Sequence, residues 1–359
     1  MGASLRPDAP TCALVGFGAI ARSTHLSALA QAGCRVVAIA EVDAGRRAIA
    51  ERCCPDAQVF ADLPALLAAC RPTFVDICSP PGHHLAALEL AAAAGVHALC
   101  EKPLVVTQGD AARVAEIVRA RGVVVGCVHN WLEAPILARL QALVAAGEVG
   151  RVQRLEAVTL RRQPAAGAAA AGNWRCDPRQ AGGGILVDHG WHALAILRRL
   201  SPAPTAGISA RLVDYAGGER VEHTAEVELS NQDGSRGRVY ATWRAASRHN
   251  HVLVAGSQGT VVADNDTLRL WHGDCLASHE QFDESLADGG YRPTWTAQVV
   301  RRFLGEVRGR AAAGTMLAEA REVIALIDAA YSAATHEQQR GVPAEAWTQA
   351  ALAGPDPVF

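Results

Sequence analysis

A short glycine-rich segment near the N-terminus limits what this chain can fold into more than any other feature. The small and apolar residues 12–15 predict a buried strand, and the letters GFGAIA follow at residues 16–21. They match the pattern G-x-G-x-x-G/A, in which the first glycine allows a tight turn, the second lets backbone N–H groups approach a pyrophosphate, and the last small residue lets a helix pack on the strand. We expect this helix over residues 20–32, with its N-terminus facing the phosphates. An ordinary glycine turn is the alternative.

A carboxylate follows at about the distance that this motif requires. The apolar residues 35–40 predict a second strand, which ends at Glu41. A carboxylate at the tip of that strand would accept hydrogen bonds from both ribose hydroxyls of NAD and would repel the 2′-phosphate of NADP. Arg46 and Arg47 lie close by in the sequence and would weaken this preference, so we expect NAD, with NADP as an alternative. A merely solvated acid at the strand end is the competing interpretation of Glu41.

The bulk composition indicates a globular protein with room for two domains. The chain has 359 residues, of which 50% are hydrophobic, and a formal net charge of −2. This charge gives no reason to expect nucleic acid or a membrane surface as a partner. No apolar run reaches the ~18 residues of a membrane span, and the N-terminus lacks the apolar core of a signal peptide. The ten cysteines are scattered without a C-x-x-C pair, so we expect free thiols and a cytoplasmic protein.

The use of lysine singles out one position. Lys102 is the only lysine among 34 lysine and arginine residues. The richness in alanine and arginine suggests a coding bias that exchanges lysine for arginine wherever charge alone is sufficient. A lysine that resists this exchange is expected to need a compact ammonium group with an adjustable pKa, which arginine lacks. Survival by chance is the alternative.

The first part of the chain alternates between predicted strands and helices. This alternation is typical of a parallel sheet with helices on both faces, in which ligands bind at the carboxyl ends of the strands. We therefore expect the turns after Val15, Ala40, Cys78, Cys100 and Val128 to line one cleft. Beyond the first two strands, the predicted strands are residues 73–78, 98–100 and 122–128, and the predicted helices are residues 63–70, 83–94 and 108–121.

The second part has a different pattern, in which short strands joined by tight turns predict an open, mostly antiparallel sheet. A helix over residues 135–147 leads into it, and the alanine- and glycine-rich residues 164–172 predict a mobile loop. The predicted strands are residues 151–161, 208–215, 221–229, 237–243, 251–255, 260–263 and 267–271, with turns at 216–218, 231–234 and 256–259. Helices are predicted over residues 182–200, 295–308 and 315–338. The architecture is therefore an α/β nucleotide-binding domain followed by an α+β domain.

Glu101, Lys102 and Pro103 follow a predicted strand and lie inside the expected cleft. An ammonium group there can donate a hydrogen bond to a substrate oxygen and stabilise developing negative charge. The proline suggests a fixed peptide that aims the lysine, with cis as a candidate geometry. A surface lysine before a proline turn is the alternative.

A second glycine-rich segment supplies further titratable groups. Residues 182–192 read GGGILVDHGWH, and on a helix Asp188 and His192 would share one face at the i, i+4 spacing. His192 could act as a general base at neutral pH while Asp188 orients it or holds a second hydroxyl. We expect His189 to point away from this face, and the three glycines to let the chain pass close to a ligand. Two alternatives are a His192 satisfied within the core and a metal bound by Asp188, His189 and His192, which is disfavoured because no second cluster completes a tetrahedral set.

Together these segments resemble the Gfo/Idh/MocA family of oxidoreductases, which includes inositol dehydrogenases and glucose–fructose oxidoreductase. The resemblance rests on GFGAIA at residues 16–21, SPPGHH at 79–84, EKP at 101–103, NWR at 173–175 and GGG-x-x-x-DHG-x-H at 182–192, which occur in this order within residues 11–340. One segment departs from the family pattern. His129, Asn130 and Trp131 replace the tyrosine- or arginine-rich segment of many inositol dehydrogenases, which leaves the polyol unidentified.

The resemblance implies an N-terminal Rossmann domain, assigned to residues 1–130, and a substrate-binding and oligomerisation domain of α+β type, assigned to residues 131–359. By motif, Lys102, Asp188 and His192 correspond to the family's catalytic residues, and these three together with Trp174 and Arg175 are expected to bind substrate. No metal ligand is expected. The residues expected to contact the cofactor are Gly16, Phe17, Gly18, Ala19, Ile20, Glu41, Ser79, Pro80, His84, Glu101, Lys102 and Asn130.

The activity that the resemblance implies is hydride transfer between NAD, or NADP, and a secondary alcohol or ketone of a sugar, cyclitol or related polyol. The substrate is then a small molecule, and the protein is expected to form a homodimer or homotetramer through its C-terminal sheet. Two alternatives are an imine reductase of the same fold, in which Lys102 or His192 would donate a proton, and a non-catalytic NAD(P)-binding regulatory protein.

Overall fold

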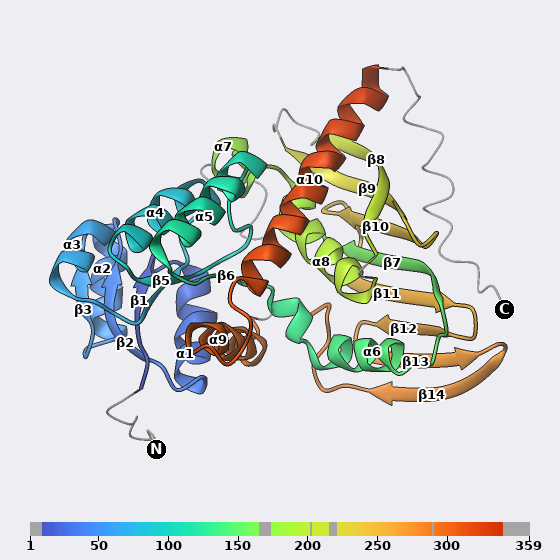
Figure 1. Ribbon diagram of the computed structural model, residues 1–359, viewed down its shortest axis with the longest axis horizontal. Helices are drawn as coiled ribbons and strands as arrows, with labels where there is room; N and C mark the ends of the chain where they lie inside the picture. The colour runs from blue at the N-terminus through green and yellow to red at the C-terminus, as the bar shows by residue number, and fades with distance from the viewer. Residues whose placement is uncertain (1–8, 165–173, 202, 215–220, 289–290, 340–359) are drawn as a thin grey trace.

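The molecule contains two β-sheets that lie side by side, with helices packed against them (Figure 1). The computed structural model describes residues 9–164, 174–201, 203–214, 221–288 and 291–339. One sheet has six strands and the other has eight. The predicted order of a parallel α/β sheet followed by a mostly antiparallel open sheet is confirmed.

The first sheet is parallel throughout, in the order β3-β2-β1-β4-β5-β6. Val15 is in register with Ala40 on one side and with Ile77 on the other, and Ile77 is in register with Cys100. The turns that follow these residues therefore gather at one edge of the sheet, as predicted. The strands are β1 Thr11–Val15, β2 Arg35–Ala40, β3 Gln58–Phe60, β4 Phe74–Ile77, β5 His97–Cys100 and β6 Val125–Cys127.

The helices of this part follow the prediction with two differences. The helix after the glycine turn starts as a π-helical turn, η1 Ala21–His25, and continues as α1 Leu26–Gln31. Helix α2 Ala44–Cys53 was not predicted; the side chain of Asp43 caps its N-terminus by accepting a hydrogen bond from Arg46 N at 2.8 Å. The other helices are α3 Leu63–Ala69, η2 Pro81–His83, α4 His84–Ala93 and α5 Gln108–Arg121.

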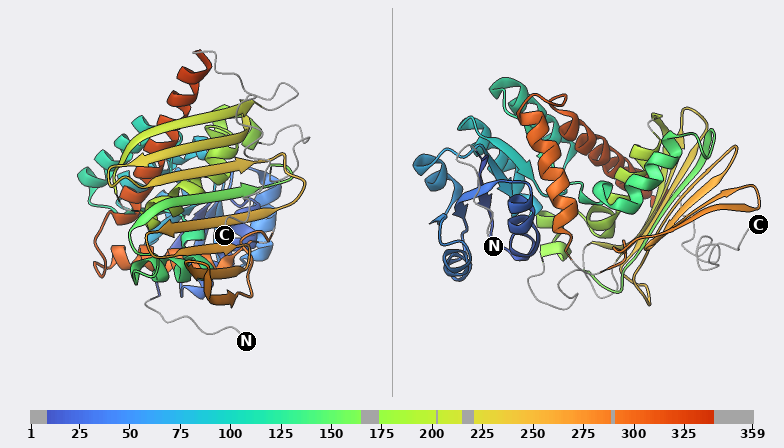
Figure 2. Two further views of the ribbon diagram at one scale, coloured as in Figure 1. Left: turned by 90° about the vertical axis from the view of Figure 1, so that its right-hand side faces the viewer. Right: turned by 90° about the horizontal axis from the view of Figure 1, so that it is seen from below.

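The second sheet has the order β14-β13-β12-β11-β7-β10-β9-β8 and is antiparallel except for the β7–β10 pair. Helices α6, α8 and α10 lie against one face of it (Figure 2). The strands are β7 Val152–Leu160, β8 Thr205–Asp214, β9 Glu222–Asn231, β10 Arg236–Thr242, β11 His249–Gly256, β12 Thr260–Asp264, β13 Thr267–His272 and β14 Cys275–Gln281. The helices are η3 Asn130–Glu133, α6 Pro135–Ala145, η4 Trp174–Cys176, α7 Pro178–Ala181, η5 Leu186–Gly190, α8 Trp191–Leu200, α9 Pro293–Val307 and α10 Thr315–Gln339.

Helix α9 returns from the C-terminal part of the chain to the core of the first sheet. The ring of Phe303 meets Phe74 of β4 edge-on, with the centroids 5.3 Å apart, and both side chains are fully buried. Helix α10 then runs past β6 to the second sheet (Figure 1). The domain boundary at residue 130 stays a prediction, and the first sheet shares its core with a helix from beyond it.

Three sequence predictions fall on residues that the structure does not describe: the loop at 164–172, apart from Pro164, the turn at 216–218, and the end of the strand at 215. Within the described helices, none combines the length and the apolarity that a membrane crossing requires.

Candidate active site

The glycine turn after β1 has the geometry of a phosphate-binding loop. Gly16 has a φ of +89°, and a Cβ at this position would lie 3.1 Å from the backbone nitrogen of Ser79, so conformation and space both require glycine. A Cβ on Gly18 would meet no atom within 4 Å, which leaves open space beside the turn. Ala21 is fully buried at the start of η1. The turn therefore has the two glycine features that the phosphate-binding pattern requires, a tight turn at Gly16 and free space at Gly18.

Glu41 lies at the carboxyl end of β2 and faces this turn. Its carboxylate accepts hydrogen bonds from Phe17 N at 2.7 Å, from Asp43 N at 2.9 Å and from Arg46 Nη2 at 3.0 Å. Burial alone would raise the pKa of Glu41, but the hydrogen bonds from Arg46 and from the two backbone groups outweigh it and lower the pKa. Arg47 donates to the carbonyl of Glu41 instead. A negative charge is therefore held where the motif expects a ribose-binding acid.

Two turns that follow β4 and β5 are tied together by a buried histidine. The ring nitrogens of His84 lie 2.8 Å from Ser79 O and 2.9 Å from Pro103 O, and His84 is fully buried. The Lys102–Pro103 peptide is cis, as the sequence suggested. The buried ring of His84 thus links the turn at Ser79 to the turn at Pro103.

A second buried histidine supports Glu101 and was not predicted from the sequence. His25 Nδ1 lies 2.7 Å from Asp76 Oδ2, and His25 Nε2 lies 2.9 Å from Glu101 Oε1. The other oxygen of Glu101 accepts a hydrogen bond from Lys102 N at 3.0 Å. Burial alone would lower the pKa of His25, but Asp76 outweighs it and raises the pKa well above its usual value. An imidazolium between two carboxylates therefore links η1, β4 and the residue before Lys102.

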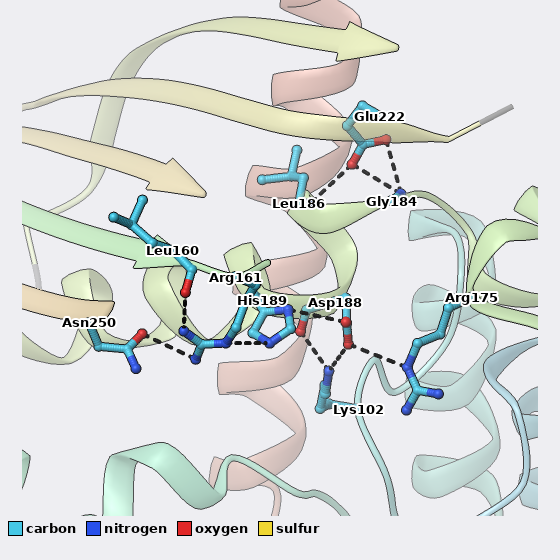
Figure 3. Close-up of polar contacts among 10 residues, drawn as sticks. All are labelled: Lys102, Leu160, Arg161, Arg175, Gly184, Leu186, Asp188, His189, Glu222 and Asn250. Carbon is cyan, nitrogen blue, oxygen red and sulfur yellow. Dashed lines mark hydrogen bonds and ion pairs between the residues drawn. The ribbon is translucent and has the colours of Figure 1, made fainter. Parts of the chain in front are cut away.

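Lys102 meets Asp188 between the two sheets (Figure 3). Its Nζ donates to the carbonyl oxygen of Asp188 at 2.6 Å and to Oδ1 at 2.9 Å. Arg175 Nε lies 4.0 Å from the same Oδ1. Burial would raise the pKa of Asp188, but Lys102, His189 and Arg175 together hold it well below its usual value. The structure thus brings together two of the three predicted catalytic residues as a charged pair.

His192 lies on α8 and lines the same cavity as Lys102. Contrary to the prediction that Asp188 orients His192, the ion pairs of Asp188 in the described part of the chain are with Lys102, Arg175 and His189. His192 is 6% exposed, and its ring stacks on that of Trp131, with centroids 4.7 Å apart and planes 7° from parallel. Burial, followed by Lys102, lowers the pKa of His192 well below its usual value. The imidazole is therefore neutral at pH 7 and able to accept a proton.

The prediction that His189 points away from the site is wrong. His189 lines the same cavity as His192, and its Nδ1 lies 3.1 Å from Asp188 Oδ2. The cause is local: η5 is a π-helical turn, whose wider winding does not keep residues four apart on one face. Asp188 is consequently directed toward Lys102 and His189 instead of His192. Burial lowers the pKa of His189 to about 4.

Two of the three glycines before η5 are required by the packing of the chain itself, and Gly183 also lines a small pocket that contains Lys102 and Asp188. A Cβ on Gly184 would lie 1.9 Å from Glu222 O, and one on Gly183 would lie 2.0 Å from the Tyr331 hydroxyl. Buried Glu222 accepts hydrogen bonds from Gly184 N and Leu186 N at 3.0 Å and from Tyr331 Oη at 2.9 Å. Glu222 and Tyr331 thus anchor the turn that carries Asp188.

A cavity of about 200 Å³ opens at the meeting point of Lys102 and His192. A smaller pocket next to it is lined by Trp174 and Arg175, whose guanidinium lies over the indole at 4.3 Å, together with Lys102 and Asp188. The larger cavity is lined by Ile20, Thr24, Glu101, Lys102, Asn130, Trp131, Arg161, His189, His192, Arg248, Ser285, Leu286, Asp288, Tyr291, Arg292 and Trp295. Of the five predicted catalytic and substrate-binding residues, Lys102 and His192 line the larger cavity. The other three, Asp188, Trp174 and Arg175, line the smaller pocket together with Lys102.

The arginines of the cavity were not predicted. Arg161 follows β7, is 1% exposed, and donates to His189 Nε2 at 3.2 Å. Burial, followed by the charge of Arg248, lowers the pKa of Arg161 to about 9, which leaves it protonated at pH 7.

Asp188, His189 and His192 do not form a set of metal ligands within the described part of the chain. The groups whose ligand atoms lie within 4.8 Å of one another there are His25 with Asp76 and Cys78, and His249 with His251 and Asp264.

Comparison with known proteins gives matches over both parts of the chain. Residues 11–129 match the family described as an oxidoreductase family with an NAD-binding Rossmann fold, and residues 137–262 match the GFO/IDH/MocA C-terminal domain. The D-glucoside 3-dehydrogenase of Escherichia coli is 30% identical over 184 residues, which is 51% of this chain and 51% of that protein. The levoglucosan dehydrogenase of Pseudarthrobacter phenanthrenivorans is 26% identical over 213 residues, or 52% and 54% of the two chains. The chain therefore spans about half the length of these relatives.

The fold is shared over a greater length than the sequence. A solved levoglucosan dehydrogenase in complex with NADH and levoglucosan superposes with a TM-score of 0.81 at 21% identity, covering 91% of this chain and 98% of that one. The arrangement of the two sheets is therefore common to both proteins.

Proposed function

The chain belongs to the Gfo/Idh/MocA family of oxidoreductases, and from this premise we propose that it oxidises a secondary alcohol, or reduces the corresponding ketone, of a sugar, cyclitol or related polyol with NAD. The observation that carries the proposal is the hydrogen bond of Lys102, at the end of β5, to Asp188, beside a cavity that contains the neutral His192. The relatives described above are sugar dehydrogenases, which favours this alcohol–ketone couple over imine reduction or a purely regulatory role.

The cofactor residues of this proposal fit the group that they would hold. Gly16 and Gly18 would take the pyrophosphate, since the first has the required backbone conformation and the second adjoins open space. Glu41 would take the adenine ribose. The remaining contacts would come from the side chains and turns at Phe17, Ala19, Ile20, Ser79, Pro80, His84, Glu101, Lys102 and Asn130. When bound, NAD supplies the hydride acceptor, or as NADH the donor. Arg46, paired with Glu41, keeps NADP as the weaker alternative.

Lys102 and His192 both act on the substrate oxygen, Lys102 as a hydrogen-bond donor and His192 as a general base. The ammonium group of Lys102 donates a hydrogen bond to that oxygen and stabilises its developing negative charge. The neutral imidazole of His192 takes the hydroxyl proton during oxidation and returns it during reduction. Asp188 holds Lys102 in place through their ion pair, and Trp174 and Arg175 line the adjoining pocket on the substrate side.

The assembly and location of the protein complete the proposal. Among the described elements, helices lie against only one face of the eight-stranded sheet, so a second copy could cover the other face and form a homodimer or homotetramer (Figure 2). The scattered free thiols favour the cytoplasm. The division into a cofactor domain at residues 1–130 and a substrate domain at residues 131–359 belongs to the same proposal.

A panel of sugars, inositols and amino-cyclitols, each assayed at 340 nm with NAD and with NADP, tests the function. We expect NAD-dependent turnover of at least one polyol, and its loss in a His192→Ala variant that still binds NADH. Near-normal turnover in that variant, or turnover of cyclic imines alone, would contradict the proposal.

A further inference from the structure

Arg161 is a buried cation whose hydrogen-bond partners are all neutral. Its guanidinium donates to Leu160 O at 2.7 Å, to Asn250 Oδ1 at 3.3 Å and to His189 Nε2 at 3.2 Å (Figure 3). It also donates to His249 O at 3.3 Å. Within the described residues no carboxylate forms an ion pair with Arg161. The charge of Asp188 raises the pKa of Arg161 from a distance, but Asp188 is itself paired with Lys102. A cation at 1% exposure without an acidic partner is costly, and an anion in the cavity would offset that cost.

The other charges that line the cavity occur in opposite pairs, with one exception. Glu101 is paired with His25, and Arg292 with Asp288 at 2.7 Å. Lys102 is paired with Asp188, as described above. The exception is Arg248, an exposed residue on the cavity wall whose Nε donates to Ala287 O at 2.9 Å and which has no ion pair in the described part of the chain.

Arg161 and Arg248 are therefore the two arginines of this cavity that have no ion pair among the described residues, and both line it. The charge of Arg248 also lowers the pKa of Arg161. Two like charges that line one cavity repel each other in the free protein. A single anion bound between them would reduce this repulsion, and a planar guanidinium is well suited to a carboxylate or phosphate group.

We propose that Arg161 and Arg248 form an oxyanion subsite, so that the preferred substrate is a polyol carrying a carboxylate or phosphate, such as a sugar acid or a sugar phosphate. This inference rests on the proposed function for the placement of the reacting carbon. Arg161 and Lys102 lie on either side of His189 and Asp188 (Figure 3). A substrate whose alcohol contacts Lys102 and His192 therefore carries its anionic group several bonds away from the reacting carbon.

Calorimetric titration of the full-length protein saturated with NADH tests this subsite without requiring turnover. The probes are hexoses of gluco and galacto configuration, with their uronates and 6-phosphates, which share a ring and differ in charge. We expect a uronate or a 6-phosphate to bind at least about tenfold more tightly than the neutral hexose, and to weaken as salt is added. Which of the two binds more tightly identifies the oxyanion.

Substitutions assign the effect to the arginines. Arg161→Gln and Arg248→Gln should each lower the affinity for the anionic probe by about ten- to a hundredfold. The affinity for the neutral hexose should change by less than about twofold. Arg119→Gln, on the exposed side of α5, removes the same charge away from the cavity and should change neither. Arg248 is exposed, so its variant tests the subsite even if Arg161→Gln does not fold.

Equal affinity for charged and neutral probes, or anion binding that survives both substitutions, would overturn the inference. The two proposals fail separately. Arginine-dependent anion binding without hydride transfer to any polyol would retain the subsite and reject the function, whereas turnover of neutral polyols with no affinity for anions would do the reverse.

Discussion

The Nζ atom of Lys102 lies 2.9 Å from Oδ1 of Asp188, a residue 86 positions further along the chain. This contact joins the end of β5 in the parallel sheet to the π-helical turn before α8. It places the only lysine of the chain where the two sheets meet. The first prediction concerns the need for lysine at this position.

Replacing Lys102 with arginine keeps the charge but changes the shape and the donor geometry. From the position of Nζ, the guanidinium cannot donate at once to the carbonyl oxygen and Oδ1 of Asp188 and to a substrate oxygen. We expect kcat to fall by about a hundredfold, comparable to the loss of one oxyanion donor. Steady-state kinetics at saturating NAD would measure this, and NADH affinity should be retained. An unchanged kcat would show that charge alone is needed.

Removal of the imidazole of His192 should lower kcat more than removal of the imidazole of His189. We expect His192→Ala to lower kcat by ~10²–10⁴-fold, the range of general base catalysis, and His189→Ala to have a smaller effect. Because the pKa of His192 lies below its usual value of 6.5, kcat/KM should stay level around pH 7 and decline only in more acidic buffer. A decline centred at or above neutral pH would assign the base to another group.

His25 should make stability depend on pH in the opposite direction from an ordinary carboxylate. Its folded-state pKa is raised above the usual 6.5, so its contribution is fully present below that pH and is lost as the pH rises toward the folded-state pKa. In that window the difference in unfolding free energy between wild type and His25→Gln should shrink by up to about 1.4 kcal/mol per pH unit. Urea unfolding at several pH values measures the slope, and a constant difference would contradict the charged state of His25.

Glu222 should stabilise the turn that carries Asp188. Glu222→Ala leaves the N–H groups of Gly184 and Leu186 buried without an acceptor, so we expect a loss of about 3 kcal/mol in unfolding free energy. Tyr331→Phe removes only one hydrogen bond to the same carboxylate and should cost about 1 kcal/mol. Chemical denaturation of both variants gives the comparison. Similar losses in both would mean that the backbone contacts of Glu222 contribute little.

The charge of Glu41 should set the preference between the two cofactors. Glu41→Gln keeps the size of the side chain and removes the repulsion of a 2′-phosphate, while Arg46 and Arg47 remain nearby. We expect the ratio of kcat/KM for NADP to that for NAD to rise by about tenfold or more. Arg46→Ala should move the ratio the other way. A ratio that neither variant changes would place the ribose site elsewhere.

The parts of the fold that the sequence predicted are those encoded by local pattern. The strand before Gly16 and the alternation of the first sheet follow from short apolar runs and glycine chemistry. Strand β14, in contrast, is an edge strand with mostly exposed side chains, so it has no apolar alternation to detect. Helix α2 buries little beyond Ala50 and gives an equally weak signal.

The sequence predicted which residues of the candidate site lie near one another, but not the contacts that they make. Lys102, Asp188 and His192 could be found because of motif and composition. The direction of His189 depends on a π-helical turn, and the roles of Arg161 and Glu222 depend on partners 28 and 38 residues away in the sequence. Such pairings are decided by how the two sheets pack, which no local pattern records.

The return of α9 to the first sheet has a consequence for synthesis on the ribosome. Phe303 completes the core around Phe74, so that core cannot close until more than two hundred further residues have emerged. A nascent chain that has just completed β6 must therefore wait with an apolar face uncovered, and chaperones have an interval in which to bind it. The part of the chain that forms the first sheet is therefore synthesised first, but its core is complete only after α9 has emerged.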